Sequence, residues 1–354
     1  MSAEGSLSIG LEVADGRVKD VSVVSSRPTS AAKVLRGRSQ EEVLRLVPLL
    51  FPVCGMAQGI ACARAVDAAR GREPDPRIEG ARSAVSLAEA TASHLFQFAI
   101  AWRRAAGASP DLGVARKARE HASSVASALL GGAPDLAKAA GAVDALAELA
   151  KPFTEDDSPL VAEVVAADRA SFGSVTIGPA PALDVRLVGT RLAEDPAFGE
   201  RPHVDGQPID ASAFASCVDD DELCDLPPAE RTGLLGRLLA RRVEARRHLA
   251  ALRARMKDLA LEGTTACLAR RGTSEGVGAA STARGPLVHW VRLAGGDVAD
   301  VRVVAPTDWT FHPRGALAVA LTGALVTPTL ARDAGWLVLA MDPCVPYTIE
   351  VRDA

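Results

Sequence analysis

The chain alternates apolar and polar residues near both of its ends, and each alternation predicts a β-hairpin. The first runs from Leu7 to Val13 and resumes from Val18 to Val24, and Ala14-Asp15-Gly16 between them has the composition of a tight turn. The same arrangement recurs from Pro286 to Leu293 and from Val298 to Val304. Because the hairpins flank a helical middle, we expect a discontinuous architecture in which the terminal segments meet in space.

Between the hairpins, apolar residues recur at helical spacing. Ser39-Gln40-Glu41-Glu42 has the form of a capping box and predicts a helix that Pro48 and Pro52 end. Leu234 to Leu261 carries an apolar stripe along a long helix. The stretch from Gly189 to Glu230 is rich in Pro, Asp and Gly and is expected to be a loop. Further helices are predicted at residues 56–69, 78–105, 114–130 and 136–150.

Composition indicates a chain with a large core and no nucleic-acid partner. The 354 residues are 48% hydrophobic, and the net charge of −4 gives no basic field for nucleic acid. The longest apolar stretch, Gly315 to Leu330, is shorter than the roughly 20 residues that span a bilayer, so no membrane insertion is expected. The N-terminus lacks the basic and apolar regions of a secretory signal, and a cytoplasmic location is expected.

Two other segments have compositions that occur in binding sites. Residues 271–284 are rich in Gly and Ser but lack the Gly-Lys-Ser/Thr ending of a phosphate loop, which argues against nucleotide binding. The predicted helix 234–261 carries many arginines. In an acidic protein these favour a solvated face, or a surface for an acidic partner, over nucleic acid or lipid.

The six cysteines do not suggest a disulfide framework, and two of them stand in contexts typical of metal ligands. Cys54 and Cys344 each occupy a short segment that looks like half of a two-cysteine metal motif, and the partner cysteine is missing from both. Cys62 is expected in the core. Cys217 and Cys224 are spaced more widely than the usual zinc pairs, which argues against a metal site there. The sequence indicates no role for Cys267.

Several blocks of the chain, in the right order, resemble the large subunit of nickel–iron hydrogenases. The resemblance covers both ends well and the middle poorly. His94 and His289 match positions that are structural in that family, so both are expected to be core histidines. The blocks are Glu4 to Leu7, Val34 to Arg38, Cys54-Gly55 with Ile60 to Val66, Ser93 to Trp102, Ala283 to Trp290, Pro306 to Arg314, and Asp342-Pro343-Cys344.

The departures from the family pattern indicate that hydrogenase chemistry is lost. Active members hold nickel and iron with four thiolates, two from each motif. In this chain Ala57 and Tyr347 stand where the second cysteines belong, and Ala32 replaces an acidic residue that would bind a divalent cation. Two thiolates cannot bridge a bimetallic centre that needs four. We therefore expect no nickel, no catalytic residues and no enzymatic activity.

The residues around the iron are better preserved, and they point to a more specific relative. By resemblance, Arg284 matches the arginine over the diatomic ligands of the iron, and Thr307 matches a residue that hydrogen-bonds a cyanide. A chain that keeps the residues around the iron but lacks the nickel ligands is similar to the HupK/HoxV family of hydrogenase expression/formation proteins. That family is implicated in assembling the Fe(CN)2(CO) unit.

Pattern and resemblance together predict the α+β class, with one large-subunit-like domain over residues 1–354. Residues 1–70 would carry the N-terminal hairpin and the Cys54 motif, and 71–262 a helical middle with a loop near 189–230. Residues 283–354 would carry the C-terminal hairpin and the Asp-Pro-Cys motif. The two hairpins would then bring Cys54 and Cys344 together.

The function that the resemblance implies is a non-catalytic scaffold that transiently holds Fe(CN)2(CO) for a hydrogenase large-subunit precursor. Cys54 and Cys344 would bind the metal, and Arg284 and Thr307 would contact its ligands. Expected partners are that precursor, a small maturation chaperone with an N-terminal cysteine, and other maturation proteins. Two alternatives stay open: a divergent metal-binding redox or hydrogen-sensing subunit, and a metal-free structural paralogue that docks hydrogenase subunits.

Overall fold

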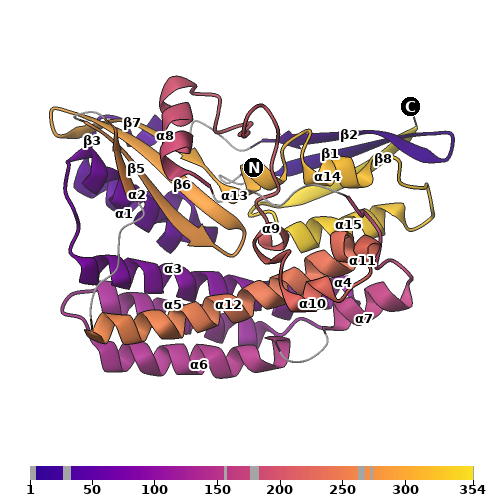
Figure 1. Ribbon diagram of the computed structural model, residues 1–354, viewed down its shortest axis with the longest axis horizontal. Coiled ribbons are helices and arrows are strands. Elements are labelled where there is room, and N and C mark those ends of the chain that lie inside the picture. Colours follow the sequence, from indigo (N-terminus) through magenta and orange to yellow (C-terminus); the bar gives the residue numbers. More distant parts are fainter. Residues whose placement is uncertain are drawn as a thin grey trace.

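Two β-sheets lie over a layer of long helices (Figure 1). The computed structural model describes residues 5–26, 33–154, 158–175, 183–261, 268–271 and 274–353. Ala32 and Cys267, singled out above, lie outside these residues. Helices and sheets occur in separate parts of the chain order, so the predicted α+β class is confirmed.

The predicted N-terminal hairpin is present, and its sheet joins the two ends of the chain. Strands β1 (Leu7–Ala14) and β2 (Arg17–Ser25) are antiparallel. Asp15 and Gly16 both have positive φ, of 51° and 72°, as a two-residue hairpin turn requires. Strand β8 (Tyr347–Asp353), which the sequence did not reveal, runs parallel to β1 on its other side. The chain ends therefore meet through β8.

The predicted C-terminal hairpin belongs to a second sheet. This sheet has the order β3-β7-β6-β5-β4, and the hairpin strands β6 and β7 lie inside it. The expected meeting of the terminal segments is therefore made by β1 and β8, whereas each hairpin pairs within its own sheet. The strands are β3 (Arg38–Ser39), β4 (Leu268–Arg271), β5 (Glu275–Thr282), β6 (Gly285–Ala294) and β7 (Asp297–Val304).

The Gly-rich segment near 271–284 forms strand β5 rather than a loop. Its glycines let the strand approach helix α2 (Gly55–Ala69) closely. A Cβ atom at Gly276 would lie 2.1 Å from the carbonyl oxygen of Ala65, and one at Gly278 would lie 2.3 Å from that of Ala61. The glycines therefore serve packing between sheet and helix, which agrees with the absence of a phosphate-loop ending.

The segment that leads to Cys54 folds as its capping sequence predicts. Helix α1 (Gln40–Leu50) begins with the expected capping box between Ser39 and Glu42 and continues past Pro48 to Leu50. A 3₁₀ turn, Pro52–Cys54, then leads into α2. Among the described residues, no single helix is long and apolar enough to cross a membrane, and the one bent pair that passes this test, α1 with Pro52–Ala69, turns by 95°.

The long helices form the lower layer in Figure 1, where α12 (Leu234–Leu261) lies beside α3 (Pro76–Phe96). Helix α3 continues through a π-helical segment, Gln97–Trp102, into α4 (Arg103–Ala105), which together fill the predicted range 78–105. The stretch predicted as a loop instead contains several short helices. The remaining helices are α5 (Leu112–Leu130), α6 (Leu136–Thr154), α7 (Pro159–Ala166), α8 (Val185–Glu194), α9 (Ala213–Cys217), α10 (Asp221–Cys224), α11 (Pro228–Thr232), α13 (Pro306–Thr310), α14 (Ala316–Leu321) and α15 (Leu330–Met341).

Candidate metal centre

Cys54 occupies the N-cap position of α2, where the 3₁₀ turn meets the helix. The residue as a whole is partly exposed, and Gln58 one turn later donates from Nε2 to the Cys54 Sγ over 3.6 Å. The Gln58 side chain is fixed in turn by His289, whose Nε2 lies 2.7 Å from Oε1. Burial lowers the pKa of His289 to about 3, so this histidine is neutral, and it orients Gln58 from within the core as expected.

Cys344 lies just after α15, and a left-handed residue sets its direction. Asp342 closes the helix with φ of 56°, and the chain then turns toward α13. There the hydroxyl of Thr307 donates to Cys344 Sγ over 3.1 Å and accepts the Cys344 backbone N–H over 3.3 Å. Thr307 is 3% exposed, so this predicted ligand-contacting residue is a buried partner of the thiol itself.

Arg284 interacts electrostatically with both cysteines. Its guanidinium makes an ion pair with Asp342, with Nε 3.1 Å from Oδ2, and donates to the Ser93 hydroxyl over 3.1 Å. Burial opposes the charged form, but the Asp342 carboxylate, and then Cys344 and Cys54 in their thiolate forms, raise the pKa of Arg284. Both cysteines therefore lie within electrostatic range of one buried arginine, although they come from opposite ends of the chain.

The thiol of Cys54 is held in its protonated form. Burial raises the pKa of Cys54 to about 12, and the neighbouring Cys344 and Glu89 add to the effect, while Arg284 and Gln58 oppose it. A metal ion bound by this sulfur must displace a proton, because the thiolate is the ligand form. Without a metal ion the Cys54 thiol is a weak nucleophile, and it becomes an anionic thiolate only when its proton is removed.

Glu89 of α3 is a part of the site that sequence reasoning missed. Its two carboxylate oxygens accept the backbone N–H groups of Met56 and Ala57, over 2.9 and 2.8 Å. These are free donors of the first turn of α2, directly after Cys54, and a carboxylate there is favourable. Burial raises the pKa of Glu89. The available signal was spacing, since Glu89 and Ser93 lie four residues apart and share a helix face.

Ala57 and Tyr347, which by resemblance stand where second cysteines are expected, supply no sulfur. Ala57 is 1% exposed and offers only a methyl group. Tyr347 begins β8, and its hydroxyl donates over 3.4 Å to the carbonyl oxygen of Gly335 in α15. The two cysteines are thus accompanied by a methyl group and a phenol that is already engaged elsewhere.

Asp342 connects the site to α12. Besides Arg284, it accepts from Arg241 Nη2 at 2.8 Å and from the Gln97 amide. Arg241 is 0% exposed and Arg237, paired with Asp210 over 2.7 Å, is 1% exposed. The prediction that the arginines of this helix form a solvated face is therefore wrong for these two, which are buried in ion pairs.

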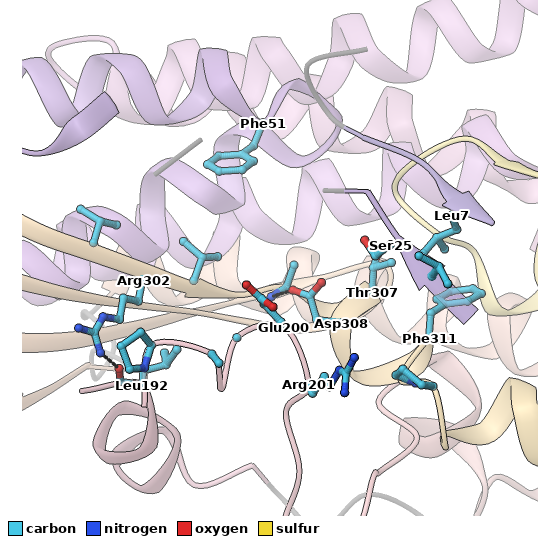
Figure 2. Close-up of a pocket in the computed structure, with 18 of the residues that line it drawn as sticks. Leu7, Ser25, Phe51, Leu192, Glu200, Arg201, Arg302, Thr307, Asp308 and Phe311 are labelled. Carbon is cyan, nitrogen blue, oxygen red and sulfur yellow. Dashed lines mark hydrogen bonds between the residues drawn. The ribbon is translucent and has the colours of Figure 1, made fainter. Parts of the chain in front are cut away.

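A cavity of about 560 Å³ lies next to the site and shares Thr307 with it. Figure 2 shows Phe51, which precedes the turn of Cys54, and Thr307, which contacts Cys344, among its lining residues. Glu200 and Arg201 line it from the loop after α8. The cavity is therefore bounded by the residue before the turn of Cys54 and by the hydroxyl partner of Cys344.

The other cysteines of the described residues are not arranged as a metal site. Cys62 is fully buried in the core, as expected, and burial raises its pKa to about 12. Cys217 is buried and Cys224 is exposed. The only group of three or more His, Cys, Asp and Glu side chains that converges within the described ranges includes neither.

Comparisons with known proteins agree with this architecture. Residues 210–345 match the family model of nickel-dependent hydrogenase. The Ni-Fe-Se hydrogenase from D. vulgaris Hildenborough in the reduced state superposes with a TM-score of 0.68 at 18% identity, over 94% of both chains. The H2-activated [NiFeSe]-hydrogenase of Dm. baculatum gives a TM-score of 0.71 at 18% identity, over 94% of this chain and 95% of that one. The fold is thus hydrogenase-large-subunit-like, as the resemblance implied.

Closer relatives match almost end to end. The hydrogenase expression/formation protein HupV of Azotobacter chroococcum mcd 1 is 29% identical over 99% of both chains. HupK of Rhizobium leguminosarum bv. viciae is 30% identical over 99% of this chain and 97% of its own. HoxV of Cupriavidus necator is 30% identical over 94% of this chain and 93% of its own. The chain therefore belongs to the family of hydrogenase expression/formation proteins that includes HupK, HupV and HoxV.

Proposed function

We propose that the chain is a non-catalytic scaffold in nickel–iron hydrogenase maturation. It would hold the Fe(CN)2(CO) unit as cargo on Cys54 and Cys344 and pass it to the hydrogenase large-subunit precursor in the cytoplasm. The names of its relatives support a role in hydrogenase formation. The observation that carries the finer proposal is the convergence of both cysteines on Arg284, beside Thr307.

The charges of the site suit a cargo held by thiolates. Around Asp342 two guanidinium groups, of Arg241 and Arg284, face one carboxylate, which leaves an excess of positive charge. Glu89 reduces this excess when it is ionised, but burial raises its pKa. Thiolates formed on loading therefore meet a compensating field, whereas the empty site keeps Cys54 protonated.

Donors to the diatomic ligands are also within the site. The Thr307 hydroxyl now donates to Cys344 Sγ, and the Arg284 guanidinium is divided between Asp342 and Ser93. Both are groups that hydrogen-bond anions such as cyanide. In the loaded protein, Arg284 would keep its pair with Asp342 and direct a remaining N–H at the cargo. Asp342 would thus position this arginine without touching the iron unit.

Infrared spectroscopy on protein isolated with its maturation partners tests the proposal. We expect cyanide and carbonyl stretching bands in the wild type, loss of these bands in Cys344→Ser, and unchanged bands in Cys62→Ser, a buried thiol away from the site. Bands that persist in the Cys54→Ser, Cys344→Ser double variant would place the cargo on a partner, and this chain would then only dock hydrogenase subunits. One bound nickel with dye reduction under hydrogen would instead support a redox or sensing subunit.

A further inference from the structure

A second group of metal-ligating side chains lies between α3 and α12, outside the cysteine site. His94 comes from α3, and Glu244 and His248 lie one turn apart on α12, so both face the same neighbour. Ligand atoms of the three residues lie within 4.8 Å of one another. His94 is 0% and Glu244 5% exposed, while His248 is partly exposed and leads toward the surface.

The three ligand atoms are buried without hydrogen bonds. Among the described residues, no hydrogen-bond partner is found for His94 Nε2, Glu244 Oε2 or His248 Nδ1. His94 Nε2 and Glu244 Oε2 are 3.2 Å apart, but they do not make a hydrogen bond of acceptable geometry. Buried polar atoms are rarely left this way unless an ion or a water stands between them. His94 is thus buried as expected, but its outer nitrogen is not satisfied by the core.

Neighbouring side chains contact the other polar atoms of Glu244 and His94. Glu244 Oε1 accepts from the Ser216 hydroxyl over 2.8 Å, which leaves Oε2 free to face the histidines. His94 Nδ1 lies 3.2 Å from Arg241 Nη2, whose stronger contact is to Asp342 at 2.8 Å. Because a guanidinium only donates, neutral His94 carries its hydrogen on Nε2. Asp342 is the stronger partner of Arg241, but the Arg241 guanidinium also acts on His94, whose pKa it lowers.

Two histidines and one carboxylate with open positions are typical ligands of zinc and ferrous iron. We propose that His94, Glu244 and His248 form a second site, which binds a divalent first-row transition-metal ion. On binding, the metal–nitrogen bond replaces the N–H bond at His94 Nε2, and the proton leaves to solvent. The ion's two positive charges are then balanced by the carboxylate and the resulting imidazolate, which the Arg241 N–H stabilises.

Burial keeps both histidines uncharged, which leaves only the Nε2 proton of His94 to be displaced on binding. Burial and Arg241 together place the pKa of His94 well below its usual value, and burial lowers the pKa of His248 to about 4. Both rings are therefore uncharged at neutral pH, so no proton need leave His248 before it binds. Burial raises the pKa of Glu244, and a bound cation would stabilise its ionised form.

Zinc binding by the Cys54→Ser, Cys344→Ser double variant tests this site separately from the proposed function. With the thiol pair removed, we expect equilibrium dialysis and elemental analysis to find one zinc ion per chain. Adding Glu244→Gln and His248→Ala should weaken binding at least about 100-fold, since changes outside the ligand shell alone cost 10–100-fold. Adding His121→Ala, on the neighbouring helix α5, should leave zinc affinity unchanged.

Cobalt substitution supplies a second readout that does not depend on affinity. Cobalt in the double variant should show visible d–d bands without an intense thiolate-to-cobalt band in the near ultraviolet. Far-ultraviolet circular dichroism checks that the His248→Ala protein is folded, since this ring is only partly buried. Absence of bound zinc in the double variant, full affinity after His248→Ala, or a thiolate band would each overturn the site.

Discussion

Replacing the Asp342 carboxylate should destabilise the protein far more than replacing a carboxylate elsewhere in the same part of the chain. Asp342 is 1% exposed and binds two arginines that are themselves 0% and 7% exposed. In Asp342→Asn the side chain keeps its size, and the backbone cost is small because Asn tolerates the left-handed φ of 56°. What is lost is the charge that compensates Arg241 and Arg284.

The size of the effect follows from the burial of that charge. Removing one partner of a buried ion pair costs about 3–5 kcal/mol. With an unfolding entropy of about 2.1 cal/mol/K per residue, the 354 residues of the chain give about 0.74 kcal/mol/K. The melting temperature should therefore fall by about 4–7 °C, as measured by calorimetry at neutral pH.

Asp333→Asn in α15 is the matched control. Asp333 is also 1% exposed, but its partners Arg169 and Arg332 have side chains that are 29% and 45% exposed. Water can solvate these arginines when the carboxylate is removed, so the cost should be about 1 kcal/mol or less and the melting temperature should fall by about 1 °C. Equal losses in the two variants would refute the reasoning that burial of Arg241 and Arg284 sets the size of the effect.

Three further changes test other parts of the account. Glu89→Ala leaves the Met56 and Ala57 N–H groups without their acceptor. Denaturant titration should show a free energy of unfolding lower by about 1–3 kcal/mol, and Glu89→Gln should have a free energy of unfolding closer to that of the wild type. Gly276→Ala places a methyl group against the Ala65 carbonyl and should reduce the yield of folded protein, whereas Gly141→Ala, where space is open, should not. Alkylation of Cys54, followed by peptide mass spectrometry, should be slow at pH 8 and accelerate toward pH 12. The raised pKa of the Cys54 thiol leaves little thiolate below that range. Fast labelling at pH 8 would contradict this prediction.

Local patterns predicted the elements around the site better than the contacts within it. The two hairpins and the helix 234–261 appear as predicted, because period-two and helical spacing are local properties of the sequence. Strand β8 was missed, because its burial pattern alternates only weakly and its partner β1 lies at the other end of the chain. Cys54, Cys344 and Arg284 were predicted from family-like motifs, because their positions along the chain do not by themselves show that they lie near one another.

There is a physical reason why the buried arginines could not be predicted from the sequence. Arginines along a helix normally indicate a solvated face, and only tertiary partners reveal otherwise. Arg241 is buried because Asp342 follows a distant helix, α15, and Arg237 because of Asp210 in the segment before α9. Glu89 escaped notice for the same reason, since its partners are backbone groups of another helix.

Transfer of labelled cargo tests most directly whether this chain is a scaffold. Protein isolated with its partners after growth with heavy-isotope cyanide precursors would be mixed with unlabelled, iron-free large-subunit precursor and then separated from it. The account predicts that isotope-shifted cyanide bands leave this chain and appear on the precursor, and that Cys344→Ser protein transfers none. Labelled bands that reach the precursor equally well from Cys344→Ser preparations would contradict it.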